Sequence, residues 1–391
     1  MSQAKKIYKD RNLQIVFGVT LMAVLGVSSI TPAFPKIVEE LNISNTDVGM
    51  LIIAFTLPGV ILTPFAGILA DRFGRKRILV PSLFLFGLAG GACALVGEFD
   101  TLIALRVVQG IGAASLGSIN LTILGDMFSG RQRAAAMGLN ASVLSTGVAA
   151  YPLLGGALAT FGWNYPFFLP LVAIPIGILV LHRLSNPEPR NKESLREYLG
   201  SAWSYLRDIK VASAFTAGVV FFLILYGPYL TYFSLYLGTS FRASPFIIGL
   251  ILSSTAITSA LVSSQMGGIV KLISVTNLVK LGFAIQAVSL AILPFMPRLE
   301  LTLISTLILG LSSGVMVPGL QTYVAGLAPS EYRAAFMSIN TTMLRLGQTL
   351  GPLLFGLAYT YTNFEGTFLY GAGLALATAI IGFIGGKIIQ K

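Results

Sequence analysis

The stretch GILADRFGRKRIL, Gly67 to Leu79, is a short charged connector between two long apolar segments. It holds five charged side chains, whereas Val48 to Ala66 and Ile78 to Gly97 hold none. Crossing a bilayer takes about 20 consecutive apolar residues in a helix. The pattern therefore predicts a loop between two membrane-spanning helices.

The composition extends this interpretation to the whole chain. Hydrophobic residues make up 55% of the 391 positions and charged residues only 10%, against roughly 25% in soluble domains. Twelve stretches are long and apolar enough to span: 13–35, 48–70, 78–97, 101–125, 134–160, 165–184, 212–237, 246–270, 275–296, 301–325, 334–360 and 364–386. The predicted fold class is an all-α integral membrane protein with twelve transmembrane helices.

The net charge of +11 would suggest a nucleic-acid partner in a soluble protein, but the positions of the basic residues indicate another origin. Of the 26 Lys and Arg, 21 fall on the side of the twelve spans that carries both termini and three on the other, and the remaining two are Arg106 and Arg345. Cytoplasmic loops of membrane proteins are enriched in Lys and Arg. We therefore expect a multi-pass protein of the cell membrane, with both termini cytoplasmic and no nucleic-acid partner.

The two halves of the chain are related by an offset of 200 residues. RAAAMGLNASVLSTGVAAYPLLGG begins at Arg133 and RAAFMSINTTMLRLGQTLGPLLFG at Arg333, and 11 of the 24 aligned positions are identical. This predicts two pseudo-symmetric six-helix bundles, residues 1–184 and 211–391. Residues 185–210 should link them through an amphipathic helix on the cytoplasmic surface. Duplicated halves that rock against each other around a central site are common in secondary transporters.

The opening stretch resembles the signature loop between helices 2 and 3 of the major facilitator superfamily. The matching positions are Gly67, Leu69, Ala70, Asp71, Arg72, Gly74, Arg75 and Lys76. The resemblance implies the major facilitator fold and transport by alternating access between two six-helix bundles.

Three further segments resemble motifs of the twelve-helix drug:proton antiporters within that superfamily. They are LGVSSITPAFP (25–35), LIALRVVQGIGAA (102–114) and GVAAYPLLGG (147–156), and the last departs from the family pattern at Tyr151, where Gly is usual. The family's helix-kinking positions correspond here to Pro32, Pro35, Gly147, Pro152, Gly155 and Gly156, with Gly351 and Pro352 in the second copy. The resemblance implies a proton-coupled exporter of small amphipathic compounds.

In the family, the loop Asp meets the start of helix 11 and a loop Arg bonds an acid at the end of helix 4. Here these places are taken by Asp71, Arg75 and Asp126, and we expect them to form a cytoplasmic latch that stabilises the outward-open state. The full latch set is Gly67, Asp71, Arg72, Gly74, Arg75, Lys76 and Asp126. The alternative is that these charges only set the topology. The equivalent segment of the second half, GGIVKLISVTNLV from Gly267, lacks the acid, so the latch would exist on one half only.

Arg106 and Arg345 are the two charges inside predicted spans. Arg345 lies about eleven residues into its helix, ~17 Å from one end and near the centre of the bilayer. A charge at that depth is costly unless it faces a polar cavity or a partner. We expect Arg345 to line a substrate cavity, whereas Arg106 either lines it or extends to the nearby interface.

Aromatic and amide side chains complete the predicted substrate site. Tyr226, Tyr229, Phe233 and Tyr236 are spaced at intervals of 3, 4 and 3 residues, which places them on one face of an α-helix. They either line the cavity or pack against a neighbouring helix. The substrate-binding candidates are Arg106, Gln109, Tyr226, Tyr229, Phe233, Asn340, Arg345 and Gln348.

No Asp or Glu falls in the middle of a predicted span, in contrast to antiporters that use an embedded carboxylate. Protons would then have to be carried by acids near the two membrane faces: Asp126, Asp71, Glu39, Glu40 or Asp47. Two unpaired arginines favour anionic or neutral amphipathic cargo over cations.

Two alternatives remain open, namely a transporter of an anionic metabolite or lipid-like molecule and a non-transporting membrane receptor. With one His and one Cys, the sequence predicts no enzyme, no metal site and no cofactor. The expected partners are a small-molecule substrate, protons and the lipid bilayer, with the protein acting as a monomer.

Overall fold

The computed structural model describes residues 10–185, 208–327 and 333–388, and all regular structure in these ranges is helical. We call α2 through α8 the N-half. Its elements are α2 (Arg11–Ser28), η1 (Thr31–Ala33), α3 (Phe34–Glu40), η2 (Asp47–Gly49), α4 (Met50–Phe73), α5 (Arg75–Cys93), α6 (Phe99–Met127), α7 (Gly130–Ala159), η3 (Tyr165–Val172) and α8 (Ala173–Arg183).

We call α10 through α16 the C-half. Its elements are α10 (Ile209–Ile224), the π-helix η4 (Leu225–Phe233), α11 (Ser234–Phe241), α12 (Pro245–Ser264), α13 (Met266–Leu272), α14 (Val275–Ile292), η5 (Leu293–Phe295), η6 (Leu299–Leu301), α15 (Thr302–Leu327) and α16 (Arg333–Ile388). The amphipathic linker helix expected within 185–210 falls on residues that, apart from the two ends of the segment, lie outside the described ranges.

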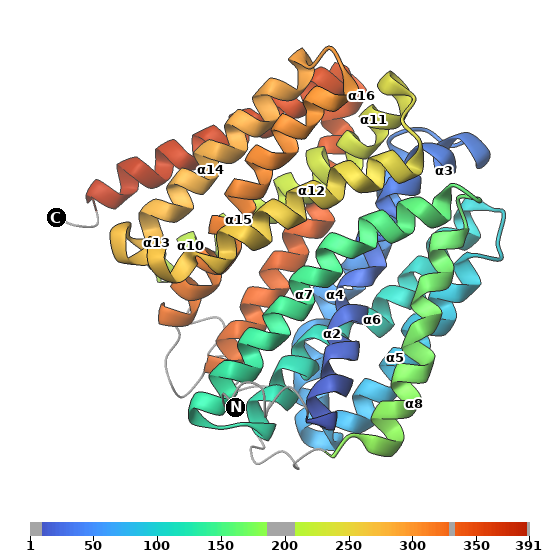
Figure 1. Cartoon of the computed structure of the whole chain (residues 1–391), viewed down its shortest axis with the longest axis vertical. Coiled ribbons are helices and arrows are strands. Elements are labelled where there is room, and N and C mark those ends of the chain that lie inside the picture. The colour runs from blue at the N-terminus through green and yellow to red at the C-terminus, as the bar shows by residue number, and fades with distance from the viewer. Residues whose placement is uncertain (1–9, 186–207, 328–332, 389–391) are drawn as a thin grey trace.

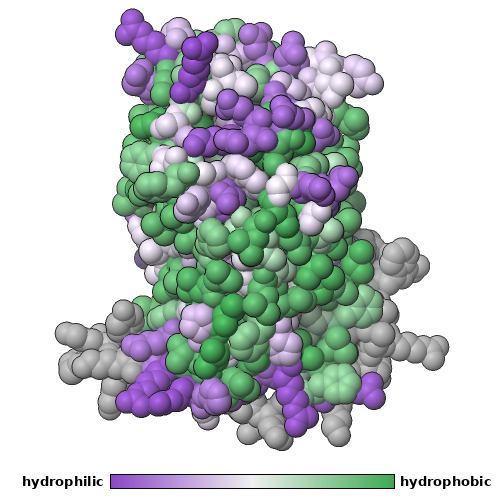
Figure 2. All heavy atoms as spheres, turned by 90° about the vertical axis from the view of Figure 1, so that its right-hand side faces the viewer, coloured by the Kyte–Doolittle hydropathy of each residue, from purple (hydrophilic) through white to green (hydrophobic). Residues whose placement is uncertain are grey.

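The predicted membrane-spanning helices are confirmed. Eleven helical stretches in the described ranges are long and apolar enough to cross a bilayer, and the last, Phe336–Gly382, covers two of the predicted spans. Within it, Asn363 interrupts the helix with φ 59° and ψ −164°. Figure 2 shows a broad hydrophobic band on one face of the molecule, with hydrophilic residues gathered above and below it.

The charged connector, Gly67 to Leu79, is a shorter loop than predicted. It forms the last turns of α4, a single-residue turn at Gly74, and the start of α5. We call the end of the molecule that carries this turn the motif end, and the other end, which carries the connection from α3 to η2, the opposite end. The first turn of α2 also lies at the motif end, at the bottom of Figure 1.

Glycines of the repeated sequence play the same packing role in both halves. A Cβ on Gly110 of α6 would overlap the backbone carbonyl of Phe55 in α4, and a Cβ on Gly310 of α15 would lie 2.7 Å from the carbonyl of Thr255 in α12. Close backbone approach through small residues is a common way for membrane helices to associate. The duplication seen in the sequence is therefore repeated in the helix packing.

The two glycines of the connector make different demands on the backbone, which gives a test of the turn. Gly74 has φ 99° and ψ 131°, a region that L side chains rarely adopt, whereas Gly67 is helical and has open space around it. We expect Gly74→Val to destabilise the protein by about 1–2 kcal/mol or more and to lower its melting temperature in detergent. Gly67→Ala should leave the melting temperature unchanged. Equal effects of the two substitutions would contradict the assigned turn.

Candidate functional site

Three hydrogen bonds join the two halves within the described residues, and together they run from the opposite end to the middle of the molecule. Near the opposite end, the Asn45 amide donates to the Tyr359 hydroxyl over 2.9 Å. Deeper in, the hydroxyls of Thr56 in α4 and Thr349 in α16 lie 2.8 Å apart. Deepest of all, Arg345 Nη2 donates to the backbone carbonyl of Ala113 in α6 over 3.1 Å.

The same end of the interface is closed by glycine and proline contacts. A Cβ on Gly249 of α12 would overlap the carbonyl of Pro152 in α7, and a Cβ on Gly156 of α7 would overlap the carbonyl of Pro245 in α12. Figure 1 shows α7 and α12 running alongside each other. Beside this crossing, a Cβ on Gly49 would lie 3.2 Å from the Pro352 side chain. The small residues therefore allow α7 to meet α12, and η2 to meet α16, at backbone distance.

The remaining residues of the predicted helix-kinking set lie against neighbouring backbone or side chains. Pro35 of α3 packs against Gly238 of α11 in the other half, and Gly155 faces the carbonyl of Ser29. The others are Pro32 in η1, Gly147 against Leu21 and Val24, and Gly351 against the backbone of Leu223 and Gly227. Pro152 lies inside α7, which continues as one helix from Gly130 to Ala159.

Arg345 reaches across the interface from the C-half. Its guanidinium occupies the space beside Gly59 of α4, where any Cβ would overlap it, and Tyr226 of η4 lies close to the same charge. None of the ion pairs between described residues involves Arg345. Arg345 lies twelve residues into α16, roughly 18 Å from its first residue. The charge is therefore held at mid-depth by a helix carbonyl and has no carboxylate partner in the described structure.

Arg106 and Gln109 lie together, but inside the N-half and away from the interface. Arg106 is fully buried, donates from Nε to the carbonyl of Leu51 over 3.1 Å and from Nη1 to Gln109 Oε1 over 2.7 Å, and its guanidinium carbon lies 4.4 Å from the centre of the Phe55 ring. These contacts connect α6 to α4. The arrangement favours a structural role for both residues.

Tyr226, Tyr229 and Phe233 have different neighbours because they lie in the π-helix η4. Tyr226 lies near Arg345, whereas the Tyr229 hydroxyl lies 2.5 Å from Thr255 Oγ1 of α12 and the Tyr229 ring stacks on Phe233 at 5.4 Å. Phe233 in turn meets Phe368 of α16. The predicted spacing assumed 3.6 residues per turn, and a π-helix has i→i+5 hydrogen bonds and a wider turn. Of these candidates, only Tyr226 accompanies Arg345.

Asn340 and Gln348 lie on the same helix as Arg345. Gln348 is partly exposed, while Asn340 is 6% exposed and lines a small hollow inside the C-half. The hollow lies between α10, α15 and α16 and is bounded by Ala214, Gly218, Phe222, Val317, Leu320, Gln321, Asn340 and Leu344. Asn340 and Arg345 therefore belong to neighbouring but separate features.

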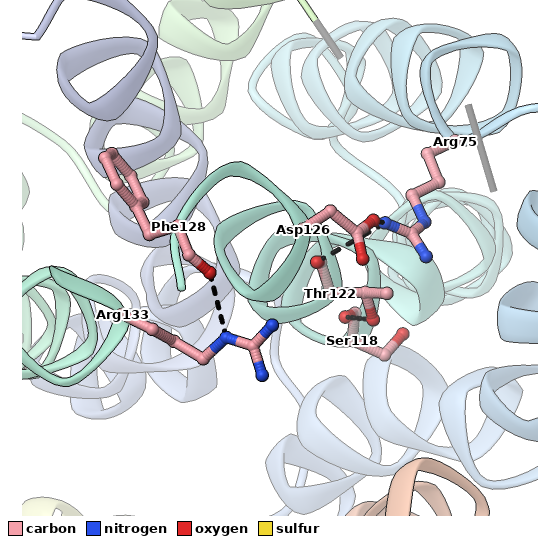
Figure 3. A network of polar contacts seen from close by, with 6 residues as sticks. All are labelled: Arg75, Ser118, Thr122, Asp126, Phe128 and Arg133. Atoms are coloured by element: carbon pink, nitrogen blue, oxygen red, sulfur yellow. Dashed lines mark hydrogen bonds and ion pairs between the residues drawn. The ribbon is translucent and has the colours of Figure 1, made fainter. Parts of the chain in front are cut away.

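Two of the latch candidates, Arg75 and Asp126, belong to a polar network at the motif end of the N-half (Figure 3). Arg75 of α5 pairs with Asp126 of α6 and donates to the Thr122 carbonyl over 3.4 Å. Lys76 donates to the carbonyl of Leu184 over 3.2 Å, while Arg72 is exposed. The side chain of Asp71 and its expected neighbour at the start of α16 lie outside the described residues. The described part of the network thus ties α5 to α6 and α8 within one half.

The other predicted proton carriers lie at the opposite end. Glu39 and Glu40 are exposed at the end of α3. Asp47 accepts hydrogen bonds from the backbone N–H of Ser44 over 3.1 Å and from its hydroxyl over 2.6 Å. This bonding stabilises the turn before η2 and α4.

Several residues of the interface were absent from the sequence-based prediction. Thr56 and Tyr359 are ordinary polar residues of predicted spans, and Asn45 lies between two spans. Only their pairing across the halves distinguishes them. Ala113 and Gly59 contribute a backbone carbonyl and an absent side chain, which leave no polar signal in the sequence. Thr349 is four residues from Arg345, and helical spacing places it on the same polar face of the helix.

The Thr56–Thr349 contact predicts a cross-link between the halves. We expect Thr56→Cys with Thr349→Cys, in a Cys93→Ser background, to form a disulfide under mild oxidation, because hydroxyls 2.8 Å apart place the Cβ atoms within disulfide reach. Non-reducing mass spectrometry of a proteolytic digest measures it. The exposed pair Ser142→Cys, in the middle of α7, with Thr322→Cys, near the motif end of α15, should cross-link much more slowly. Equal rates for the two pairs would contradict the arrangement.

Comparisons with known proteins agree with this architecture. The sequence model of the Major Facilitator Superfamily matches residues 16–241 and 214–386. Multidrug resistance protein 2 of Bacillus subtilis is 25% identical over 369 residues, covering 92% of this chain and 91% of that protein. Quinolone resistance protein NorA of Staphylococcus aureus is 22% identical over 379 residues, covering 95% and 96%. The crystal structure of a mutant of the nucleoside transporter NupG superposes with a TM-score of 0.80 at 15% identity, covering 96% of this chain and 99% of that one.

Proposed function

Because this chain belongs to the major facilitator superfamily, we propose that it exports small amphipathic compounds across the cell membrane in exchange for protons. The multidrug and quinolone resistance relatives, which align over nearly the whole chain, support an efflux function. The protein works as a monomer whose two six-helix bundles, residues 1–184 and 211–391, alternate between facing the cytoplasm and facing the outside.

The distribution of contacts between the halves is the observation that carries this proposal. The hydrogen bonds between them extend from the opposite end only as far as Arg345. The Lys and Arg excess on the termini side assigns the motif end to the cytoplasm. On this assignment the described conformation is closed to the outside, and the motif end is where cargo enters.

The reverse conformation needs its own stabilising contacts at the motif end. Arg75 and Asp126 are already paired, so the N-half presents a rigid α5–α6 corner there. We assign this corner, together with Asp71, to the latch that holds the cytoplasmic side shut after cargo has entered. The first turn of α16 is the docking point on the other half, since a helix N-terminus favours a nearby carboxylate.

Proton coupling runs through acids near the membrane faces, since no carboxylate among the described residues pairs with Arg345. Asp126 is the strongest candidate, because protonation of its carboxylate would release Arg75 and loosen the α5–α6 corner. Asp71, Glu39, Glu40 and Asp47 are the other carriers in this proposal. Asp47 also stabilises the turn before η2 by accepting a hydrogen bond from Ser44, so its loss would affect folding as well as transport.

Asp126→Asn provides a test of coupling at this corner. We expect this substitution to abolish uptake driven by a pH gradient in proteoliposomes while leaving cargo counterflow without a gradient, because only net proton movement needs a titrating group. Asp100→Asn, an exposed acid in the first turn of the same helix α6, is the matched control. Unchanged gradient-driven uptake in Asp126→Asn would remove this carboxylate from the coupling route.

Arg345 supports a second candidate function, the transport of anionic amphipathic compounds. Its guanidinium contacts a helix carbonyl, and an anionic group is a stronger partner than a neutral carbonyl. Cargo with a carboxylate or phosphate would therefore replace the Ala113 carbonyl as the partner of the guanidinium. A lipophilic cation would be repelled by the same charge.

Counterflow of 2-naphthoate and of tetraphenylphosphonium in proteoliposomes separates the two candidates. If anions are carried, Arg345→Gln should lower the affinity for 2-naphthoate about 10- to 100-fold, the value of a charge-assisted hydrogen bond, and leave the cation unaffected. Arg298→Gln, an exposed arginine at the opposite end, should change neither. Unaltered anion transport in Arg345→Gln would exclude Arg345 as the anion-binding group. Transport of the cation alone would support multidrug export instead.

A further inference from the structure

A buried polar triad joins three helices of the N-half. The Thr20 hydroxyl of α2 lies 2.5 Å from Asn140 Oδ1 of α7, and Asn120 Nδ2 of α6 donates to the same hydroxyl over 2.5 Å. All three side chains are at most 4% exposed. A hydroxyl group is thus the central member of a buried hydrogen-bonded cluster.

Two positions of the triad have counterparts in the C-half through the repeat offset of 200 residues. Asn140 corresponds to Asn340 within the repeated segment, and Asn120 corresponds to Leu320, on helices already matched by Gly110 and Gly310. The amide of α7 is therefore retained in α16, whereas the amide of α6 is replaced by an apolar side chain in α15.

The counterpart of Thr20 follows from the first residues of α2 and α10 and from the packing of these two helices. Asp10 and Asp208 each cap the following helix by accepting a backbone N–H two residues on, which gives an offset of 198 for α2 and α10. The same offset relates the contacts of two equivalent glycines: Gly147 packs on Leu21 and Val24, and Gly347 packs on Val219 and Phe222. Thr20 therefore corresponds to Gly218.

The small hollow of the C-half lies where this triad would be. Gly218, Leu320 and Asn340 all line it, so the hydroxyl and one amide of the N-half cluster are replaced here by empty space and an apolar wall. Asn340 is 6% exposed, and its amide makes no hydrogen bond to another described residue. The amide is not among the fully enclosed unpaired groups, so it reaches the open space of the hollow, where a hydroxyl group of a ligand can bond to it.

We propose that this hollow is a subsite for a neutral hydroxyl group of the cargo. About 20 Å³ is open to the centre of a water-sized group, enough for one such group. The hydroxyl takes the place that Thr20 fills in the N-half and donates to Asn340 Oδ1. Phe222 at the same hollow offers an aromatic face to the apolar part of the molecule.

The charge around the subsite favours a neutral group. No acidic or basic side chain lines the hollow, whereas Arg345 lies five residues beyond Asn340 on α16 and faces the other half. A rise of 1.5 Å per residue separates the two by ~7.5 Å along the helix. Cargo that uses both features is a flat amphipathic molecule with a hydroxyl at one end. This inference rests on the proposed transport of amphipathic compounds and specifies their chemistry.

Equilibrium dialysis against the full-length protein in lipid nanodiscs, corrected with empty nanodiscs, tests the subsite with two neutral probes. 2-Naphthol carries the hydroxyl donor and 2-methoxynaphthalene lacks it. We expect the wild type to bind 2-naphthol about 2- to 10-fold more tightly, as one hydrogen bond predicts. Asn340→Leu should remove this difference while retaining the binding of 2-methoxynaphthalene.

Gly218→Thr rebuilds the triad's hydroxyl in the C-half and should block the subsite. The added Cβ would lie 2.9 Å from a terminal methyl of Leu344, a flexible side chain that can shift. We expect this variant to lose the preference for 2-naphthol at an unchanged or raised melting temperature, which separates blocking from misfolding. Gly138→Thr, at an exposed helical glycine with open space around it, is the matched control and should keep the preference.

Three results would overturn the proposal. Equal binding of both probes by the wild type, or no binding of either, would mean that the hollow holds water only. A preference that survives in Gly218→Thr would place the hydroxyl elsewhere. Failure of the proposed transport function would look different, because the binding preference and its loss in the variants would remain while proteoliposomes moved no cargo.

Discussion

The hydrogen bond from Arg345 to the Ala113 carbonyl joins the two halves at the depth where a charge is hardest to keep in a membrane. A carboxylate partner would satisfy the guanidinium and fix it, but a carbonyl already used by its own helix is a weak acceptor. Gly59 makes room for the charge on the facing helix. In the proposed function, this contact helps to close the interface and is exchanged for cargo. We regard it as the point where closure of the halves and cargo binding compete for the same group.

The duplication accounts for the similar helix packing in the two halves. The positions at which the two copies differ are those that we assign to gating and cargo binding. Gly110 and Gly310 retain equivalent packing roles. By contrast, the charged connector survives only in the first copy, the polar triad is complete only around Thr20, and Arg345 stands where the first copy has Ser145. In this account the N-half supplies the frame and the charged connector. The C-half carries Asn340 and Arg345, the groups that meet the cargo.

Much of the fold could be predicted because a bilayer imposes simple rules on the sequence. Apolar length identified the spans, and the repeat identified the related packing of Gly110 and Gly310. The position of Arg345 well inside a helix also followed from the sequence. Its partner could not, because a backbone carbonyl and a missing side chain leave no pattern to recognise. Tyr226, Tyr229 and Phe233 differ from the prediction for a related reason. Their predicted common face depends on α-helical geometry, whereas residues 225–233 form a π-helix. For Arg106, the contacts with Leu51 and Gln109 depend on how α6 meets α4.

Pulsed electron–electron resonance on full-length protein in nanodiscs tests the central claim that Arg345 controls which end of the interface is closed. Spin labels replace Gln132 and Ser213 near the motif end, and Asn42 and Thr239 near the opposite end, all exposed positions. The account predicts two conformers in which one pair is near when the other is far, with Arg345→Gln shifting the population away from the conformer closed at the opposite end. Unchanged distances in Arg345→Gln, or both ends widening together, would contradict it.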